Sequence, residues 1–153
     1  GSTGSNAAQQ VGLRRVKNLA KLTPKEGGSL LDDTSFQRKL NETEIQLESI
    51  QYTEFRLMAA LAKGESPGPE SSVLKTLSAD IQQQLTELSV EVIAEFAAAH
   101  QPEARTVGTN TSSIGHDDGK MAFTQYFNLR ASSIAGGTNE VQKNIIAKMV
   151  LGL

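Results

Sequence analysis

Hydrophobic residues recur at spacings of three and four along most of this chain, and no segment alternates as a half-buried strand does. The first periodic segment predicts a helix from about Asn6, a good N-cap, to about Lys21. Its expected apolar side consists of Val11, Val16, Leu19 and Ala20. Residues 22–33, which include a proline and two glycines, predict a turn-rich connection.

The second periodic segment predicts a long helix that begins near Asp33 or Thr34 and ends at Lys63, before Gly64. Spacings of four and three define its expected buried seam, which consists of Phe36, Leu40, Thr43, Leu47, Ile50, Glu54, Leu57 and Leu61. Roughly 30 residues at 1.5 Å each make a helix about 45 Å long. A helix of that length needs neighbours along it.

The stretch ESPGPESS over residues 65–72 breaks the chain, and Ser71 or Ser72 is expected to cap a third helix that ends near His100. The expected seam of this helix consists of Leu74, Leu77, Ile81, Leu85, Leu88, Val92 and Phe96. Residues 100–119 are polar and aperiodic, which predicts a long loop.

A fourth helix is expected over residues 120–133, and a fifth follows the Gly-Gly-Thr break at residues 136–138. The fifth helix carries its hydrophobic residues on one side, namely Val141, Ile145, Ile146, Met149, Val150 and Leu153. The whole pattern predicts an all-α fold, an up-and-down bundle of four to five helices with two long central helices.

The composition narrows the function classes. A formal charge of −2 and a pI near 5.7 give no reason to expect a nucleic-acid partner. The absence of cysteine excludes disulfides and thiolate chemistry. No apolar run approaches the ~20 residues that span a bilayer, and no signal-peptide pattern is present, so we expect a cytoplasmic protein without membrane insertion.

Few residues are candidates for independent chemistry. His100 suits a helix end, and His116–Asp118 lacks the spacing of helical metal ligands, so we expect no metal site. Ser132 and Ser133 have no sequence context that would activate a nucleophile. Glu54 interrupts the seam of the second helix, and we interpret it as paired or at the seam edge rather than as a buried base.

The Gly-Gly-Thr break differs from the other turns. Gly136 and Gly137 remove side-chain bulk, so another group can approach the backbone closely. Thr138 is a natural N-cap, and Glu140 suits the positive end of the helix dipole. Two readings stay open on these grounds: a capped interhelical turn, or a site where free N–H groups bind a ligand.

The closing stretch YFNLRASSIAGGTNEVQKNIIAKMVLGL resembles the end of the C-terminal helical domain of the acyl-CoA dehydrogenase family. In that family a Gly-Gly-Thr-(Ser/Asn)-Glu-(Ile/Val)-Gln run leads into a helix ending in Val-Leu-Gly-Leu. Upstream, LLDDTSFQRKLNETEIQ resembles the family's second long helix, and GESPGPESSVLK resembles its Pro-Gly turn. Residues 1–153 are therefore expected to form this domain alone, without the family's N-terminal helical and middle β-barrel domains.

The resemblance implies a function for the whole enzyme: α,β-dehydrogenation of an acyl-CoA thioester with FAD as cofactor. By the same resemblance, the cofactor-binding residues are Thr138, Asn139 and Glu140 at the start of the last helix. The implied partners are acyl-CoA, through the full-length enzyme, and further subunits in a homo- or hetero-oligomer.

The sequence departs from the family pattern at several positions. Some relatives place the catalytic Glu where this chain has Gly136, which cannot abstract a proton. Others place it near the start of the first helix, so the base is expected just before Gly1, and no catalytic residue is assigned. A Gln-x-x-Gly-Gly flavin contact falls on EVIAE at residues 91–95, and an Arg-x-x-Phe-Gly segment is missing from residues 19–28. These departures suit a divergent subfamily or an assembly with incomplete sites.

Two alternatives to the dehydrogenase domain stay open: a non-catalytic helical oligomerisation module and a flavin-binding relative with altered chemistry. The opening GSTGSN resembles a vector scar, but we favour a native sequence cut just upstream. An isolated chain is expected to be inactive and to expose apolar helix faces that favour association.

Overall fold

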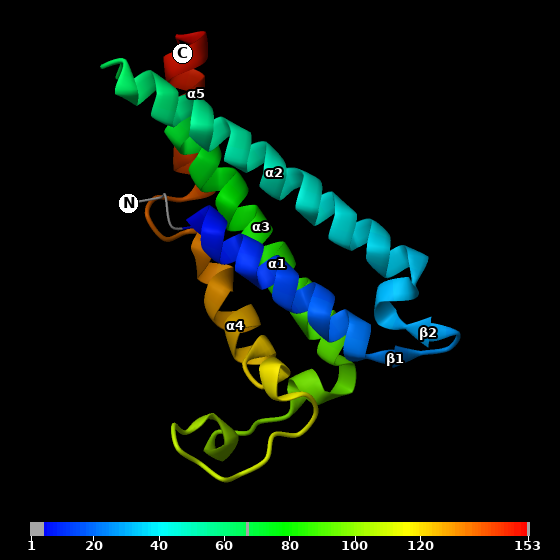
Figure 1. The fold of residues 1–153 in the computed structure, drawn as a ribbon. Helices are drawn as coiled ribbons and strands as arrows, with labels where there is room; N and C mark the ends of the chain where they lie inside the picture. The colour runs from blue at the N-terminus through cyan, green and yellow to red at the C-terminus, as the bar shows by residue number, and fades with distance from the viewer. Residues whose placement is uncertain (1–4, 67, 153) are drawn as a thin grey trace.

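The computed structural model describes residues 5–66 and 68–152, and it confirms the expected all-α bundle (Figure 1). Its α-helices are α1 (Ser5–Leu22), α2 (Thr34–Ala62), α3 (Glu70–Ile93), α4 (Ala122–Leu129) and α5 (Asn139–Leu151). Short 3₁₀ segments join them: η1 (Leu30–Asp32), η2 (Ala94–Ala98), η3 (Glu103–Arg105), η4 (Asp117–Gly119) and η5 (Arg130–Ser133). The long helices α2 and α3 lie side by side, and α1 and α4 pack against α3.

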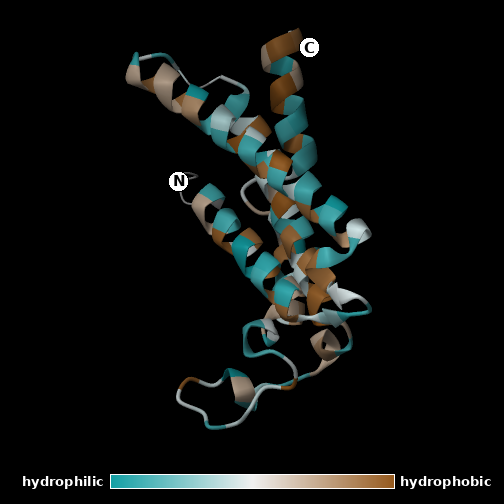
Figure 2. Cartoon of the chain, turned by 45° about the vertical axis from the view of Figure 1, so that its right-hand side comes forward, coloured by the Kyte–Doolittle hydropathy of each residue, from teal (hydrophilic) through white to brown (hydrophobic). Residues whose placement is uncertain are grey.

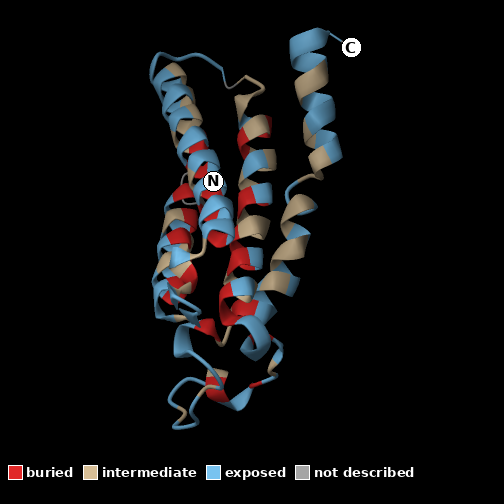
Figure 3. Cartoon of the chain, turned by 90° about the vertical axis from the view of Figure 1, so that its right-hand side faces the viewer, coloured by how far each residue is buried: buried red, intermediate tan, exposed pale blue. Residues whose placement is uncertain are grey.

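The hydrophobic core lies where α1, α2 and α3 meet, and buried residues face one another along these helices (Figure 3). The largest fully buried side chains are Phe36, Ile50, Ile81, Val16 and Val92. Because the core includes most of the predicted seams of α2 and α3, helical periodicity identified the central packing correctly.

Several residues predicted to be in the core are exposed instead: Val11, Leu61, Leu77 and Phe96. On α1 the buried side is centred on Leu13 and Val16, so Val11 faces outward. The C-terminal end of α2 extends beyond the start of α1, which leaves its last turns, including Leu61, without a neighbour from that helix (Figures 1 and 2). Periodicity locates a hydrophobic stripe but does not show how much of it another helix covers.

Three helix ends differ from the prediction. The first helix already includes Ser5, so Asn6 lies within it and is not its N-cap; the question about GSTGSN falls mostly outside the described residues. The third helix has Pro69 as its N-cap rather than Ser71 or Ser72. It ends at Ile93, short of His100, because the following residue, Ala94, has a positive φ of 50°, which cannot continue a right-handed helix.

The connection over residues 22–33 is turn-rich as predicted, but it also contains a two-stranded ribbon that the sequence did not indicate. Strand β1 (Pro24–Lys25) pairs antiparallel with β2 (Gly28–Ser29). Two-residue strands show no detectable alternation, so periodicity could not reveal them. The fourth predicted helix is divided into α4 and η5, and residues 100–119 form the expected loop.

Asp33 begins α2 as predicted, and it also links the helix to the ribbon. Its Oδ1 accepts a hydrogen bond of 2.9 Å from the Phe36 N–H, and its Oδ2 lies 2.6 Å from Lys25 Nζ. The hydrogen bonds from Lys25, Ser35 and the Phe36 N–H hold the pKa of Asp33 well below its ordinary value. The ionised carboxylate is therefore the form that stabilises the fold.

We expect Asp33→Ala to lower the Tm at neutral pH by about 2–4 °C, because the helix loses its cap. Since the pKa of Asp33 is lower in the folded chain than in the unfolded one, its contribution is present above the ordinary pKa of 3.8 and is lost as pH falls below it. Thermal melts of both proteins from pH 7 to pH 3 test this, and the difference in Tm should shrink at the acidic end. Asp33→Asn keeps the cap, so it should retain more stability than Asp33→Ala.

Candidate functional site

The Gly-Gly-Thr break forms a tight left-handed turn between η5 and α5. Gly136 and Gly137 have φ values of 70° and 98°, which favour glycine. A Cβ added at Gly136 would meet no atom within 4 Å, so open space lies beside the backbone at this residue. The turn therefore has both the conformation and the free space that close approach of another group requires.

Thr138 caps α5, as the sequence predicted. Its Oγ1 accepts a hydrogen bond of 3.3 Å from the Val141 N–H. The N–H groups of the first turn carry the positive end of the helix dipole. A hydrogen bond with its own backbone N–H, and then one with Thr138, lower the pKa of Glu140, whose side chain is exposed. The capped turn is thus confirmed, with Thr138 as the cap.

Asn139, the third predicted site residue, ties the start of α5 to α3. Its Oδ1 accepts a hydrogen bond of 3.2 Å from Lys75 Nζ, and its Nδ2 donates one of 3.3 Å to Asp80 Oδ1. Lys75 also donates to the carbonyl oxygen of Ser133, 3.4 Å away, on the other side of the turn. One lysine of α3 therefore holds both flanks of the Gly-Gly-Thr turn.

A second set of contacts fixes η5, which precedes the turn. The Arg130 guanidinium lies 2.7 Å from a Glu87 carboxylate oxygen, donates to the Gln83 carbonyl at 2.9 Å and to Thr86 Oγ1 at 2.9 Å. It also stacks over the Tyr126 ring, 4.5 Å from the centroid. In return, Gln83 Nε2 donates to the Arg130 carbonyl at 3.1 Å. The position of the turn is thus set mainly by side chains of α3.

A cleft of about 510 Å³ adjoins the turn. Its walls come from Glu54 in the C-terminal half of α2, from the N-terminal half of α3, and from the chain between α4 and the turn. They include Leu74, Lys75, Gln82, Leu129 and Ala135. Glu54 Oε2 accepts a hydrogen bond of 3.2 Å from Asn6 Nδ2, which confirms the paired reading of this carboxylate. A cleft of this size suits a small organic ligand.

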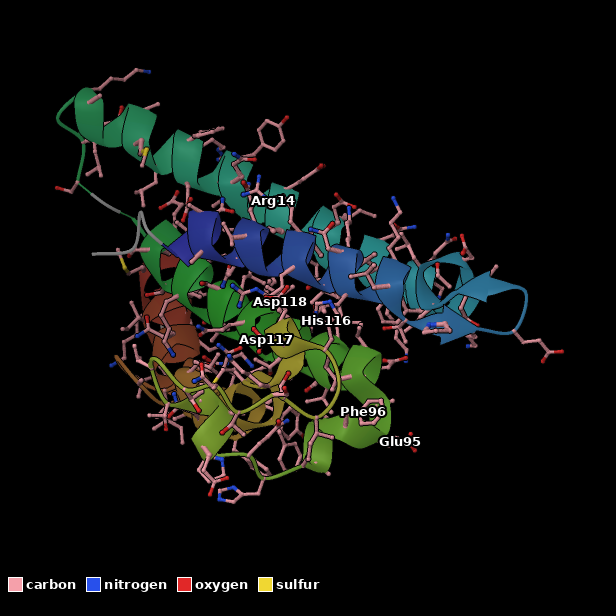
Figure 4. All side chains as sticks on the ribbon, turned by 60° about the horizontal axis from the view of Figure 1, so that its bottom comes forward. Arg14, Glu95, Phe96, His116, Asp117 and Asp118 are labelled. Carbon is pink, nitrogen blue, oxygen red and sulfur yellow. The ribbon has the colours of Figure 1, made fainter. Side chains whose placement is uncertain are left out.

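The other candidates from the sequence are not brought to this site. His116–Asp118 lies in the long loop, where His116 Nδ1 accepts from the Asp118 N–H at 3.2 Å (Figure 4). The loop approaches Phe96 closely at Gly115, where an added Cβ would lie 2.9 Å from the Phe96 Cβ, but Phe96 remains exposed. His100 is exposed, on the stretch that follows η2. Within residues 5–66 and 68–152 no group of three or more potential ligands could hold a metal ion.

The segment with the altered flavin contact lies at the end of α3 and in η2. The Glu91 carboxylate pairs with Lys39 Nζ at 2.9 Å, and Glu95 is exposed. Glu91 therefore links α3 to α2, and Glu95 faces solvent. None of the described helices is both long enough and apolar enough to cross a membrane.

Comparisons with known proteins give a consistent relationship. Residues 3–151 match the family model described as the acyl-CoA dehydrogenase C-terminal domain. A relative from Mycobacterium tuberculosis (strain ATCC 25618 / H37Rv), acyl-CoA dehydrogenase IpdE1, is 30% identical over 147 residues, which is 95% of this chain and 33% of the relative. This chain thus spans about a third of that relative's length.

Solved structures show the same fold. In the ChsE4–ChsE5 complex from Mycobacterium tuberculosis, the matching chain is 26% identical with a TM-score of 0.71, over 97% of this chain and 36% of that one. The FAD complex of PigA gives a TM-score of 0.75 at 19% identity, over 97% of this chain and 34% of that one. The helical arrangement around the turn is therefore shared with chains about three times as long.

Proposed function

The chain belongs to the acyl-CoA dehydrogenase family, and from this premise we propose that it is the C-terminal domain of an FAD-dependent enzyme that dehydrogenates an acyl-CoA thioester between its α and β carbons. The observation that carries the proposal is the left-handed glycine turn, open beside Gly136 and followed by the capped start of α5. The remaining two thirds of the relatives' length would supply the other walls of the site.

The residues present at the turn fit a flavin. A bulky planar group can approach the turn because no Cβ fills the space at Gly136. The positive end of the α5 dipole suits the polar and negatively charged parts of FAD. When bound, FAD would supply the redox chemistry by accepting hydride from the β-carbon.

Three residues of this chain would hold the cofactor, with different parts in the proposal. Thr138 would present the capped N-terminus of α5, and its neighbour Glu140 would lie at the exposed edge. Asn139 would act by fixing the turn, because its side-chain amide is already engaged by Lys75 and Asp80. The negative charge of Glu140 partly offsets the positive end of the helix dipole.

The cleft beside the turn would receive the acyl group, and the proton would be removed by a residue outside this domain. Gly136 has no side chain for that step, and Glu54, the carboxylate in the cleft wall, is engaged by Asn6. The base would come from the rest of the enzyme or from another subunit. A partner subunit fits the exposed apolar side of α5, which includes Val141, Ile145, Met149, Val150 and Leu151.

That apolar side also favours the second candidate, a helical module that joins subunits without chemistry of its own. Every described residue of α5 escapes full burial, so this helix has a free face (Figure 3). The two functions separate experimentally. Purified full-length protein that holds FAD and reduces an electron acceptor with acyl-CoA supports the dehydrogenase, whereas a flavin-free assembly supports the module.

We expect Thr138→Val to weaken FAD retention by the full-length enzyme about tenfold, because α5 loses its cap next to the cofactor. Flavin fluorescence after gel filtration measures the bound fraction. Thr138→Ser retains the hydroxyl and should retain FAD. Asp33→Ala removes another N-cap at the opposite end of the bundle, so it should lose stability without losing flavin. Equal FAD retention in Thr138→Val and the wild type would show that Thr138 does not contribute to FAD binding.

A further inference from the structure

Two buried amide side chains lie on one face of α1, next to the cleft. Asn6 and Gln9 are each only 5% exposed and lie three residues apart, one turn along the helix. Asn6 donates its amide hydrogen to Glu54, and Gln9 donates to the carbonyl and Oγ of Ser78 at 2.8 and 2.9 Å. Their carbonyl oxygens, Asn6 Oδ1 and Gln9 Oε1, are buried and accept no hydrogen bond within residues 5–66 and 68–152.

The orientation of Gln9 is fixed by its partner. A backbone carbonyl can only accept, so the Gln9 nitrogen must face Ser78, and its oxygen must point elsewhere. Buried amide oxygens in folded proteins nearly always have a donor. An unpaired acceptor at this depth therefore indicates that a donor from outside the described chain belongs there.

Gln9 lies in the wall of a groove of about 250 Å³ between α1, α3 and α4. This groove and the larger cleft share Ser78, Gln82 and Leu129 in their walls, so the two hollows adjoin. Gln82 is half-buried, and its amide could face a ligand in either hollow. A ligand that enters beside the glycine turn can therefore extend along the cleft towards Gln9.

We propose that the groove receives the far end of the acyl group, and that this end carries a hydroxyl or another hydrogen-bond donor, which Gln9 Oε1 accepts. The inference rests on the proposed acyl-CoA dehydrogenase function, and it adds the class of substrate: an oxygenated acyl group rather than a plain alkyl chain. An alkyl chain would leave the buried Gln9 oxygen without a partner, as it is in this domain alone, and sites built to bond a hydroxyl discriminate against analogues that lack it.

The test uses the full-length enzyme and two matched probe series, straight-chain acyl-CoAs of six to twelve carbons and the same compounds with a terminal hydroxyl. Isothermal titration gives the Kd of each compound, and turnover of the unsubstituted series is measured on the same preparation. We expect the best hydroxylated compound to bind roughly three- to tenfold more tightly than its parent. In Gln9→Met, which keeps the size but has no amide oxygen, this ratio should fall to about one.

Gln10→Leu is the matched control, because Gln10 lies on the same helix but lines a different hollow, shared with α2. It should keep the wild-type ratio. Gln9→Asn provides a second variant if Gln9→Met folds poorly, and the ratio within one preparation does not depend on the folded fraction. Equal Kd values for the two series in the wild type, with normal turnover, would overturn this inference alone. Absence of both binding and turnover would overturn the proposed function as well.

Discussion

Phe36→Ala is expected to destabilise the domain by about 3–5 kcal/mol, which is a large share of the stability of a typical domain. Phe36 is 0% exposed and stands at the start of α2, where the core of α1, α2 and α3 comes together. Removing its ring leaves a cavity that the surrounding helices fill only in part. Urea denaturation followed by circular dichroism should show a lower midpoint with an unchanged slope.

The matched change on the same helix is Phe55→Ala. Phe55 is 54% exposed and contacts Tyr52 edge to face, with ring centroids 6.3 Å apart. We expect its loss to change the stability by no more than about 0.5 kcal/mol, since few buried contacts disappear. Comparable destabilisation by the two variants would show that the C-terminal part of α2 is covered in the folded assembly, contrary to the structure of the single chain.

Gly137→Val is expected to weaken FAD binding by the full-length enzyme about tenfold to a hundredfold. The φ of 98° is unfavourable for a β-branched residue, and the new Cβ would lie 2.7 Å from Gln142 Nε2. The turn must then rearrange at the place where the flavin is proposed to approach. Equilibrium titration of the apoenzyme with FAD measures the effect.

Gly64→Val separates the loss of the turn from general backbone strain. Gly64 has a similar left-handed φ of 80°, with nothing within 4 Å of an added Cβ, and it follows the C-terminal end of α2. This variant should lower the Tm while leaving the Kd for FAD unchanged. An equal loss of FAD affinity in both variants would mean that backbone strain anywhere in the bundle weakens FAD binding. The proposal that the glycine turn contacts the flavin would then lose its support.

Sequence periodicity predicted the bundle because α2 and α3 bury one stripe each, as Leu40, Ile50 and Ile81 show. The caps at Asp33 and Thr138 were also predicted, since capping depends on local residue type. The exposure of Val11 and Leu77 was not, because burial depends on how each helix is rotated against its neighbours. No local signal carries that information.

The sequence predicted only the part of the candidate site that is formed by consecutive residues. The glycine turn and its cap are contiguous in sequence, whereas the α3 side chains that hold the turn and the preceding η5 segment are 43 to 64 residues away from their partners. Three of the residues in these contacts are polar and lie outside the predicted buried seams, namely Lys75, Gln83 and Arg130. A single sequence therefore does not distinguish them from solvent-exposed surface residues. The unpaired oxygens of Asn6 and Gln9 could not be foreseen either, because helix packing alone determines which polar groups lose water.

Side chains of α3 hold the glycine turn, whereas the outward side of α5 has no such contacts among the described residues. The two parts of this segment are therefore expected to tolerate substitutions differently. Lys75 bonds the residues that flank the turn, and Arg130 fixes the η5 segment before it. By contrast, no described residue of α5 is fully buried. Substitutions on that outward side can accumulate during evolution without moving the turn. The exposed surface of α5 can therefore change in sequence while the glycine turn keeps its place.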